Sequence, residues 1–275
     1  MNYTENRVTG CDNEVLVVSF GTTSSESRRL NIGAAEQTIR DAFPDSFSVH
    51  RAFTSQTVIN IIFKREGIRI DNVAEALDRA VLNGVKHLTV QPTHLMKGLE
   101  YDKLQGILTD YSESFESIAL GDPLLTSDDD FSRTADALIE ASDAYDDGKT
   151  AIVFMGHGTE AASNRVYEKM QSVFSGKGKV NYYVGTVEAS PSLDDVIAAV
   201  RQGGYSSVIL RPMMLVAGNH AVNDMADADD PDSWYSRFTA KGYKTVCIIE
   251  GLGQLASIRE IYADHALKAA VVAVG

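Results

Sequence analysis

Three residues that could bind a divalent metal each follow a separate apolar stretch of the chain. His157 comes directly after "TAIVFMG", Glu188 ends "VNYYVGTVE", and His220 follows "SVILRP" within the segment "LVAGNHAVNDM". Two imidazoles and one carboxylate form a recognised ligand set for divalent metals, and three protein ligands leave coordination positions open for water or substrate. The pattern therefore indicates a metal site that is open on one side.

Each of these residues, taken alone, also fits an ordinary structural role. A histidine in a glycine-flanked turn is commonly a hydrogen-bonding loop residue. Glu188 could cap the helix that starts near Ser190, because a carboxylate beside a helix N-terminus is stabilised there. The metal interpretation draws its support from the number of strands, since three of them deliver these side chains to the same edge of a predicted sheet. The residues alone leave both interpretations open.

The elements that must position these side chains form a repeated pattern. Apolar strand-like runs alternate with amphipathic helical runs, and each half of the chain contains four such strands. The predicted strands are residues 14–20, 47–53, 87–92, 117–123, 150–156, 180–188, 207–212 and 244–250. This order predicts an α/β fold with two similar lobes, residues 1–125 and 126–275, each a parallel four-stranded sheet flanked by helices. In such sheets ligands bind beyond the carboxyl ends of the strands.

The two halves also resemble each other in sequence. "SFGTT" (19–23) matches "GHGTE" (156–160), and "VQPTHLMKGLEYDKL" matches "LRPMMLVAGNHAVNDM". The match pairs Phe20 with His157 and Glu100 with His220, while a residue near Ala52 corresponds to Glu188. Only the second lobe then has the paired imidazoles. We therefore expect the C-terminal lobe to carry the metal site, with one metal per chain.

Composition excludes several classes of function. The net charge is −13 and the 25 Lys and Arg residues are scattered, which argues against nucleic-acid binding. The chain shows no secretory leader and no run of about 18 apolar residues, so we expect a cytoplasmic protein without a membrane partner. Two cysteines are too few for a disulfide framework or a thiolate metal site. Neither a GxGxxG nor a Walker A motif occurs, which predicts no nucleotide cofactor.

The chain resembles the class II, ATP-independent cobalt chelatases of the CbiK family, within the chelatase superfamily that includes ferrochelatase. The similarity runs through "LVVSFGTT", "GDPLL", "VFMGHGT", "VGTVEASP", "MLVAGNHAVNDMA" and "DSWYSRF", and so covers nearly the whole chain. The resemblance implies two flavodoxin-like or Rossmann-like lobes with a tetrapyrrole cleft between them. It also implies that His157, Glu188 and His220 are the metal ligands and catalytic residues.

The function implied by this resemblance is insertion of Co²⁺ into sirohydrochlorin during anaerobic cobalamin biosynthesis. The divalent metal is then a substrate, and Fe²⁺ or Ni²⁺ are the alternatives to Co²⁺. Two other functions stay open: a sirohydrochlorin ferrochelatase of sirohaem synthesis, and a tetrapyrrole or metal carrier without turnover. The oligomeric state, including a homo-oligomer, also stays open. We favour His157 as the acceptor of a pyrrole proton.

Sirohydrochlorin is a polycarboxylate, so an acidic protein needs local cations and backbone N–H groups to bind it. We expect Arg51, at the end of the second strand, to neutralise acid arms, with Arg211 and Lys97 as further candidates. Glu100 is predicted to face the cleft, although a carboxylate at a helix start is an equally good description of it. The residues predicted to bind the substrate are Arg51, Glu100, His94, Thr22 and Met214.

Overall fold

The computed structural model describes residues 11–272, and the chain divides into two compact units. The first unit comprises the chain up to Leu124 together with the segment from Arg259 onward, and the second unit comprises Leu125–Ile258. The expected second lobe, residues 126–275, therefore differs from the structure at its C-terminal end. The reason is a strand, β9 (Ala270–Val271), that pairs antiparallel with β4 (Ser117–Leu120) of the first unit.

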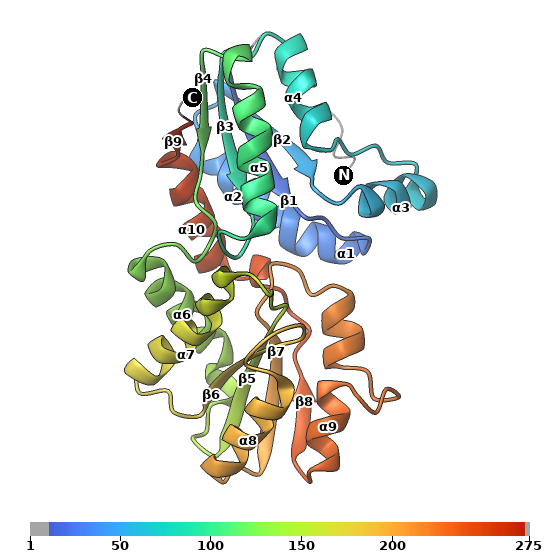
Figure 1. Cartoon of the computed structure of the whole chain (residues 1–275), viewed down its shortest axis with the longest axis vertical. Helices are drawn as coiled ribbons and strands as arrows, with labels where there is room; N and C mark the ends of the chain where they lie inside the picture. Colours follow the sequence, from blue (N-terminus) through green and yellow to red (C-terminus); the bar gives the residue numbers. More distant parts are fainter. Residues whose placement is uncertain (1–10, 273–275) are drawn as a thin grey trace. The chain divides into compact units, whose positions relative to one another are not determined.

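The first unit is built on a five-stranded sheet with the order β2-β1-β3-β4-β9 (Figure 1). Strands β1 (Asn13–Ser19), β2 (Phe47–Phe53), β3 (His87–Pro92) and β4 are parallel, as predicted. The fifth strand was not predicted, because the segment "IREIYADHALKAAV" reads as one continuous helix. In the structure that helix, α10 (Ala256–Leu267), ends before the apolar residues that form β9.

Helices cover the sheet of the first unit because their apolar faces repeat at helical spacing. Leu77 of one helix and Leu104 of another are buried against Leu16 and Val90 of the strands. The α-helices are α1 (Ser25–Ser27), α2 (Ala34–Ala42), α3 (Gln56–Glu66), α4 (Val73–Leu82), α5 (Leu99–Asp110) and α10, with a π-helical turn η1 (Arg28–Gly33) and a 3₁₀ turn η2 (Ser112–Ser114).

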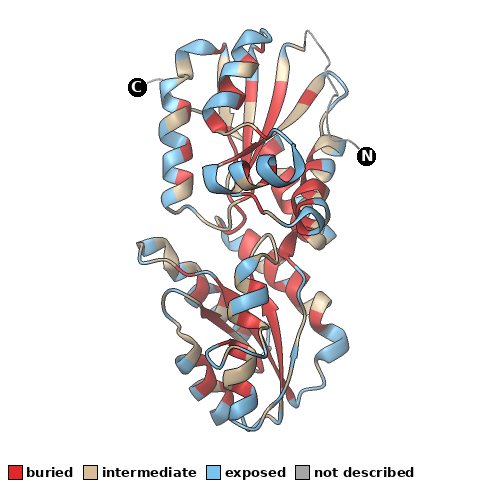
Figure 2. Ribbon diagram, turned by 90° about the vertical axis from the view of Figure 1, so that its right-hand side faces the viewer, coloured by how far each residue is buried: buried red, intermediate tan, exposed pale blue. Residues whose placement is uncertain are grey.

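The second unit is built on a four-stranded parallel sheet with the order β6-β5-β7-β8. Its strands are β5 (Thr150–Gly156), β6 (Tyr182–Thr186), β7 (Ser207–Pro212) and β8 (Lys244–Cys247). Every residue of β5 is buried, as expected of a parallel strand that is covered on both faces. Figure 2 shows this division in both units, with buried strands inside and exposed residues on the outer helix faces.

The helices of the second unit start at recognisable caps. The side chains of Ser127 and Ser192 each accept a hydrogen bond from the backbone amide three residues later. The carboxylates of Asp130 and Asp195 in turn accept from the backbone amide of the capping serine. The helices are α6 (Asp128–Ser142), α7 (Arg165–Gly176), α8 (Leu193–Gly203) and α9 (Trp234–Ala240), with 3₁₀ turns η3 (Asp143–Tyr145), η4 (Ala162–Asn164) and η6 (Leu252–Gln254). A π-helical segment, η5 (His220–Met225), lies where the sequence suggested only a loop.

The two sheet edges share a hydrogen-bond pattern that aligns the repeats. The amide of Ser55 donates to the carbonyl of Phe20, and the amide of Glu188 donates to the carbonyl of His157. Phe20 is thus the structural counterpart of His157, as the sequence repeat indicates. The counterpart of Glu188 is Ser55 and not Ala52, which lies within β2. None of the helices within residues 11–272 combines the length and apolar composition needed to cross a bilayer.

Candidate metal centre

His157 lies directly beyond the carboxyl end of β5, between two glycines that the local packing requires. A Cβ on Gly156 would approach the Tyr167 ring to 2.1 Å. Gly158 has a φ of +87°, and a Cβ there would lie 2.9 Å from the amide nitrogen of Ala189. Both neighbours of His157 therefore have to be small, and the turn holds the imidazole at the edge of the sheet.

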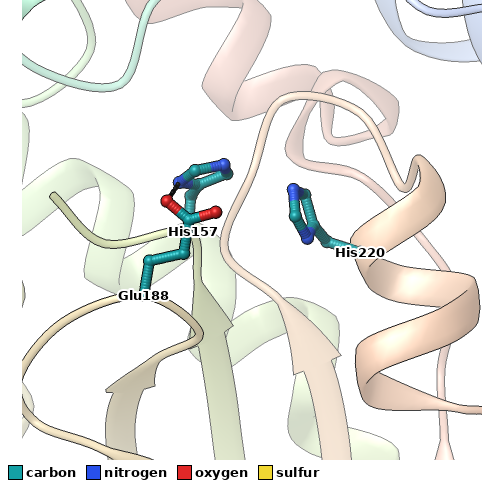
Figure 3. Close-up of side chains that lie close together, drawn as sticks. All are labelled: His157, Glu188 and His220. Carbon is teal, nitrogen blue, oxygen red and sulfur yellow. Dashed lines mark ion pairs between the residues drawn. The ribbon is translucent and has the colours of Figure 1, made fainter.

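Glu188 lies two residues beyond β6, and its backbone amide donates to the carbonyl of His157 at 2.9 Å. Its carboxylate oxygen Oε2 lies 3.5 Å from Nδ1 of His157. The expected helix that follows it, α8, is capped by Ser192 instead. Glu188 therefore does not serve as the N-cap of α8, and its carboxylate extends beside the imidazole of His157 (Figure 3).

His220 is the first residue of η5, and its ring faces that of His157. The ring centroids are 4.6 Å apart with an interplanar angle of 84° (Figure 3). The Nδ1 atoms of both histidines already have oxygen acceptors: the Gly158 carbonyl lies 3.0 Å from Nδ1 of His157, and Asp224 Oδ2 lies 2.6 Å from Nδ1 of His220. These contacts place the proton on Nδ1 and leave Nε2 of each ring with the lone pair that a metal needs.

One ligand atom from each of His157, Glu188 and His220 lies within 4.8 Å of the others. Ligands that share one ion at about 2.1 Å are roughly 3–4 Å apart, so small rotations of the side chains are enough to close the set. His157 and Glu188 are about half exposed, which gives them room to rotate. Within residues 11–272 this is the one group of three or more His, Cys, Asp or Glu side chains with such spacing.

The counterparts in the first unit form no such set. Phe20 is 55% exposed at the end of β1, and Ser55 caps α3 by accepting from the amide of Val58. Glu100 lies in the first turn of α5 and accepts a hydrogen bond from Lys103 at 2.8 Å. Burial raises the pKa of the Glu100 carboxyl, but the hydrogen bond and charge of Lys103 outweigh it and leave the pKa below its ordinary value.

His94 follows β3 and is partly buried in the first unit, with both of its ring nitrogens shielded from solvent. Neither of its ring nitrogens has a hydrogen-bond partner, and burial lowers the pKa of the imidazole to about 4. Its backbone carbonyl accepts a hydrogen bond from the Tyr262 hydroxyl at 3.2 Å. The imidazole of His94, which is predicted to contact the substrate, is therefore neutral, and neither of its ring nitrogens has a hydrogen-bond partner in the structure.

The structure gives three other predicted substrate residues contacts within their own units. Arg51 forms a two-point ion pair with Glu36, with both N–O distances 2.6 Å. The Thr22 hydroxyl accepts from the amide of Ser24 at 3.3 Å, so it closes the turn after β1. Met214 packs on the hydrophobic core of the second unit. Their predicted contacts with a tetrapyrrole stay predictions.

The two additional cations also have partners. Arg211 is buried, donates to the carbonyl of Ala141 at 2.6 Å and lies 2.9 Å from Glu250. Lys97 lies 2.6 Å from Asp122. One residue at the metal centre, Asp224, was not predicted from the sequence. Its spacing of four residues from His220 was the available signal, but it is informative only once the segment is known to be helical.

The comparisons with known proteins agree with this architecture. The chain has two α/β units built on parallel strands, and one unit holds three candidate metal ligands at the carboxyl edge of its sheet. This combination is typical of the chelatase class. Residues 13–271 match the family model described as cobalt chelatase (CbiK), and the chain belongs to that family.

Two curated relatives and one solved structure illustrate the match. A sirohydrochlorin cobaltochelatase of Salmonella typhimurium is 35% identical over 94% of this chain and 97% of its own length. The sirohydrochlorin cobaltochelatase CbiKC of Nitratidesulfovibrio vulgaris is 31% identical over 94% and 90%. The structure of SirB from Bacillus subtilis with Fe³⁺ has a TM-score of 0.62 at 11% identity, covers 93% of this chain and 94% of its own, and is similar in fold.

Proposed function

We propose that this protein inserts Co²⁺ into sirohydrochlorin without ATP, as a step of anaerobic cobalamin biosynthesis. The observation that carries the proposal is the convergence of His157, Glu188 and His220 at one sheet edge, with ligand atoms within 4.8 Å of one another. Membership of the cobalt chelatase family supports it, as do relatives named sirohydrochlorin cobaltochelatase. In this proposal Co²⁺ is a substrate that the three side chains hold before transfer.

The chemistry of insertion favours a weak and open ligand set. Co²⁺ must exchange water and protein ligands for four pyrrole nitrogens, and two ring N–H protons must leave the macrocycle. A closed four-ligand cage would retain the metal, whereas two imidazoles and one carboxylate leave positions where ring nitrogens can enter stepwise. The partial exposure of His157 and Glu188 suits such an exchange. Once His157 has released the metal, its Nε2 can accept one pyrrole proton.

The test is anaerobic absorption spectroscopy of the purified protein with excess sirohydrochlorin and Co²⁺. We expect the free-base spectrum to convert to that of the metallated product over many turnovers. The His157→Ala and His220→Ala variants should fold normally and lose most of this rate, because each removes one ligand from the edge of the sheet. Equal steady-state rates in both variants and the wild type would contradict the assignment.

The same assay separates the alternatives. A carrier would stop after one equivalent of tetrapyrrole per chain, whereas a chelatase converts the excess. Ligand type alone discriminates poorly between Co²⁺, Fe²⁺ and Ni²⁺, so parallel reactions with the three metals are needed. We expect the highest kcat/KM with Co²⁺, and a higher value with Fe²⁺ would favour a ferrochelatase instead.

A further inference from the structure

The imidazole of His220 is held from behind by a carboxylate that belongs to the same short helical segment. Asp224 Oδ2 lies 2.6 Å from Nδ1 of His220, which makes this the shortest polar contact of the three candidate ligands. A carboxylate only accepts hydrogen bonds, so the imidazole donates and Nδ1 carries the proton. The lone pair of His220 is then on Nε2, on the other side of the ring.

The helical segment that carries this pair is fixed to the core of the second unit. Ala221 and Met225, each one residue after a member of the pair, are fully buried in the same cluster as Val153 and Leu210. The amide of Ala221 also donates to the carbonyl of Gly218 at 3.0 Å. One stripe of η5 is therefore packed into the protein, while the neighbouring stripe presents His220 and Asp224, which are partly exposed.

We propose that Asp224 is a positioning residue for metal binding, an inference that rests on the proposed function of the metal centre. Its hydrogen bond selects the Nδ1–H tautomer of His220, restricts rotation of the ring and makes Nε2 a better donor to Co²⁺. Carboxylates that accept from a metal-bound histidine act in this way in metal sites generally, and their loss typically weakens metal affinity about 10- to 100-fold. Asp224 itself does not contact the metal or the tetrapyrrole.

His157 is held by a neutral acceptor and not by a carboxylate outside the ligand set. Its Nδ1 lies 3.0 Å from the carbonyl of the adjacent Gly158 and 3.5 Å from Glu188, which is itself a candidate ligand. The contact with Glu188, at 3.5 Å, is 0.9 Å longer than the 2.6 Å contact between His220 and Asp224, and the backbone carbonyl of Gly158 is the nearer acceptor for His157. The two histidines therefore differ in how firmly they are oriented, and the difference depends on Asp224.

The experiment is a double-mutant cycle read out by anaerobic titration of the full-length protein with Co²⁺. Asp224→Ala should weaken Co²⁺ binding about 10- to 100-fold. Asp224→Asn should weaken it less, because the amide oxygen can still accept from Nδ1. In the His220→Ala background, Asp224→Ala should have no further effect, since its action runs through the imidazole. The visible absorption of bound Co²⁺ in Asp224→Ala should shift towards that of His220→Ala.

The same titration includes a control variant. Asn223→Ala, an exposed change on the same segment, should bind Co²⁺ like the wild type, and circular dichroism should show that every variant is folded. Unchanged affinity in Asp224→Ala, or an equal loss in the presence and absence of His220, would overturn the positioning role. If His220→Ala itself binds Co²⁺ as the wild type does, the proposed ligand set fails and the positioning role falls with it.

Discussion

Arg51 forms an ion pair with Glu36, and its position near the end of a strand also led to the prediction that it contacts the substrate. We expect Arg51→Ala to raise the KM for sirohydrochlorin while leaving the affinity for Co²⁺ nearly intact, because the predicted contact is with an acid arm of the substrate. Glu36→Gln is the matched control, since it weakens the same ion pair but keeps the guanidinium. If Arg51→Ala lowers only the unfolding temperature, the residue acts through Glu36 alone.

His94 predicts a pH dependence of stability. Burial lowers the pKa of its imidazole to about 4, below the ordinary value of 6.5. The unfolded chain therefore binds a proton on His94 at a higher pH than the folded chain does. The free energy of unfolding keeps its full value with respect to His94 above pH 6.5 and decreases as the pH falls towards 4. The full shift corresponds to a free energy on the order of 3 kcal/mol. The nearby Glu100 charge opposes the shift but does not cancel it.

We expect His94→Leu to reduce the loss of thermal stability between pH 6.5 and 4, because leucine neither binds a proton nor leaves buried nitrogens without partners. Thermal unfolding followed by circular dichroism across this range measures the effect. His87→Leu, at the exposed start of β3, is the control. Parallel pH profiles for His94→Leu and the wild type would show that protonation of His94 does not limit stability in acid.

At the scale of elements, the turn after β5 sets the spacing between two candidate ligands. Gly158→Ala should cost about 1–2 kcal/mol for its positive φ and should also weaken Co²⁺ binding, because the new Cβ pushes against the loop that carries Glu188. Gly148 has a similar φ of +71° with nothing within 4 Å of the added Cβ. Gly148→Ala should therefore lower stability without changing metal affinity. A Co²⁺ titration and an unfolding curve for each variant test whether Gly158→Ala alone weakens metal binding.

All eight parallel strands could be predicted from the sequence, whereas two short elements, η5 and β9, could not. Four of the eight predicted strands, residues 47–53, 87–92, 150–156 and 207–212, have the observed bounds, because their apolar runs are closed by polar or turn-forming residues. The segment from Gly218 to Met225 reads as a loop, and the packing of Ala221 and Met225 in the core, which its spacing does not predict, helps to stabilise the π-helical turn. Strand β9 has only two residues, and it is a strand because it pairs with β4, a contact that its own sequence does not indicate.

At the scale of the whole molecule, the repeat predicts one metal per chain. The second unit supplies His157, Glu188 and His220, whereas the first unit has Phe20 and Ser55 at the positions of the first two. Titration with Co²⁺ should saturate at one equivalent per chain. Two equivalents, or a site that survives loss of both histidines, would mean that the first unit binds metal independently.

The candidate ligands could be predicted because parallel strands end at a common edge, which makes the residue after each strand informative. Asp224 and the ion pair of Arg51 with Glu36 could not be predicted, because the spacing of Asp224 from His220 is informative only once the segment is known to be helical, and the ion pair joins two separate elements. Glu36 lies 15 residues from Arg51 and on a different element, and nothing in the spacing selects it among the neighbouring acids.

The pairing of β9 with β4 makes the first unit a discontinuous one, interrupted by residues 125–258. The second unit is contiguous, so all of its residues have left the ribosome before the first unit receives its last strand. The unit with the candidate metal ligands therefore has its whole sequence available before the first unit, which still needs β9 to complete its sheet. Loss of the C-terminal segment should accordingly harm the half of the protein that is made first.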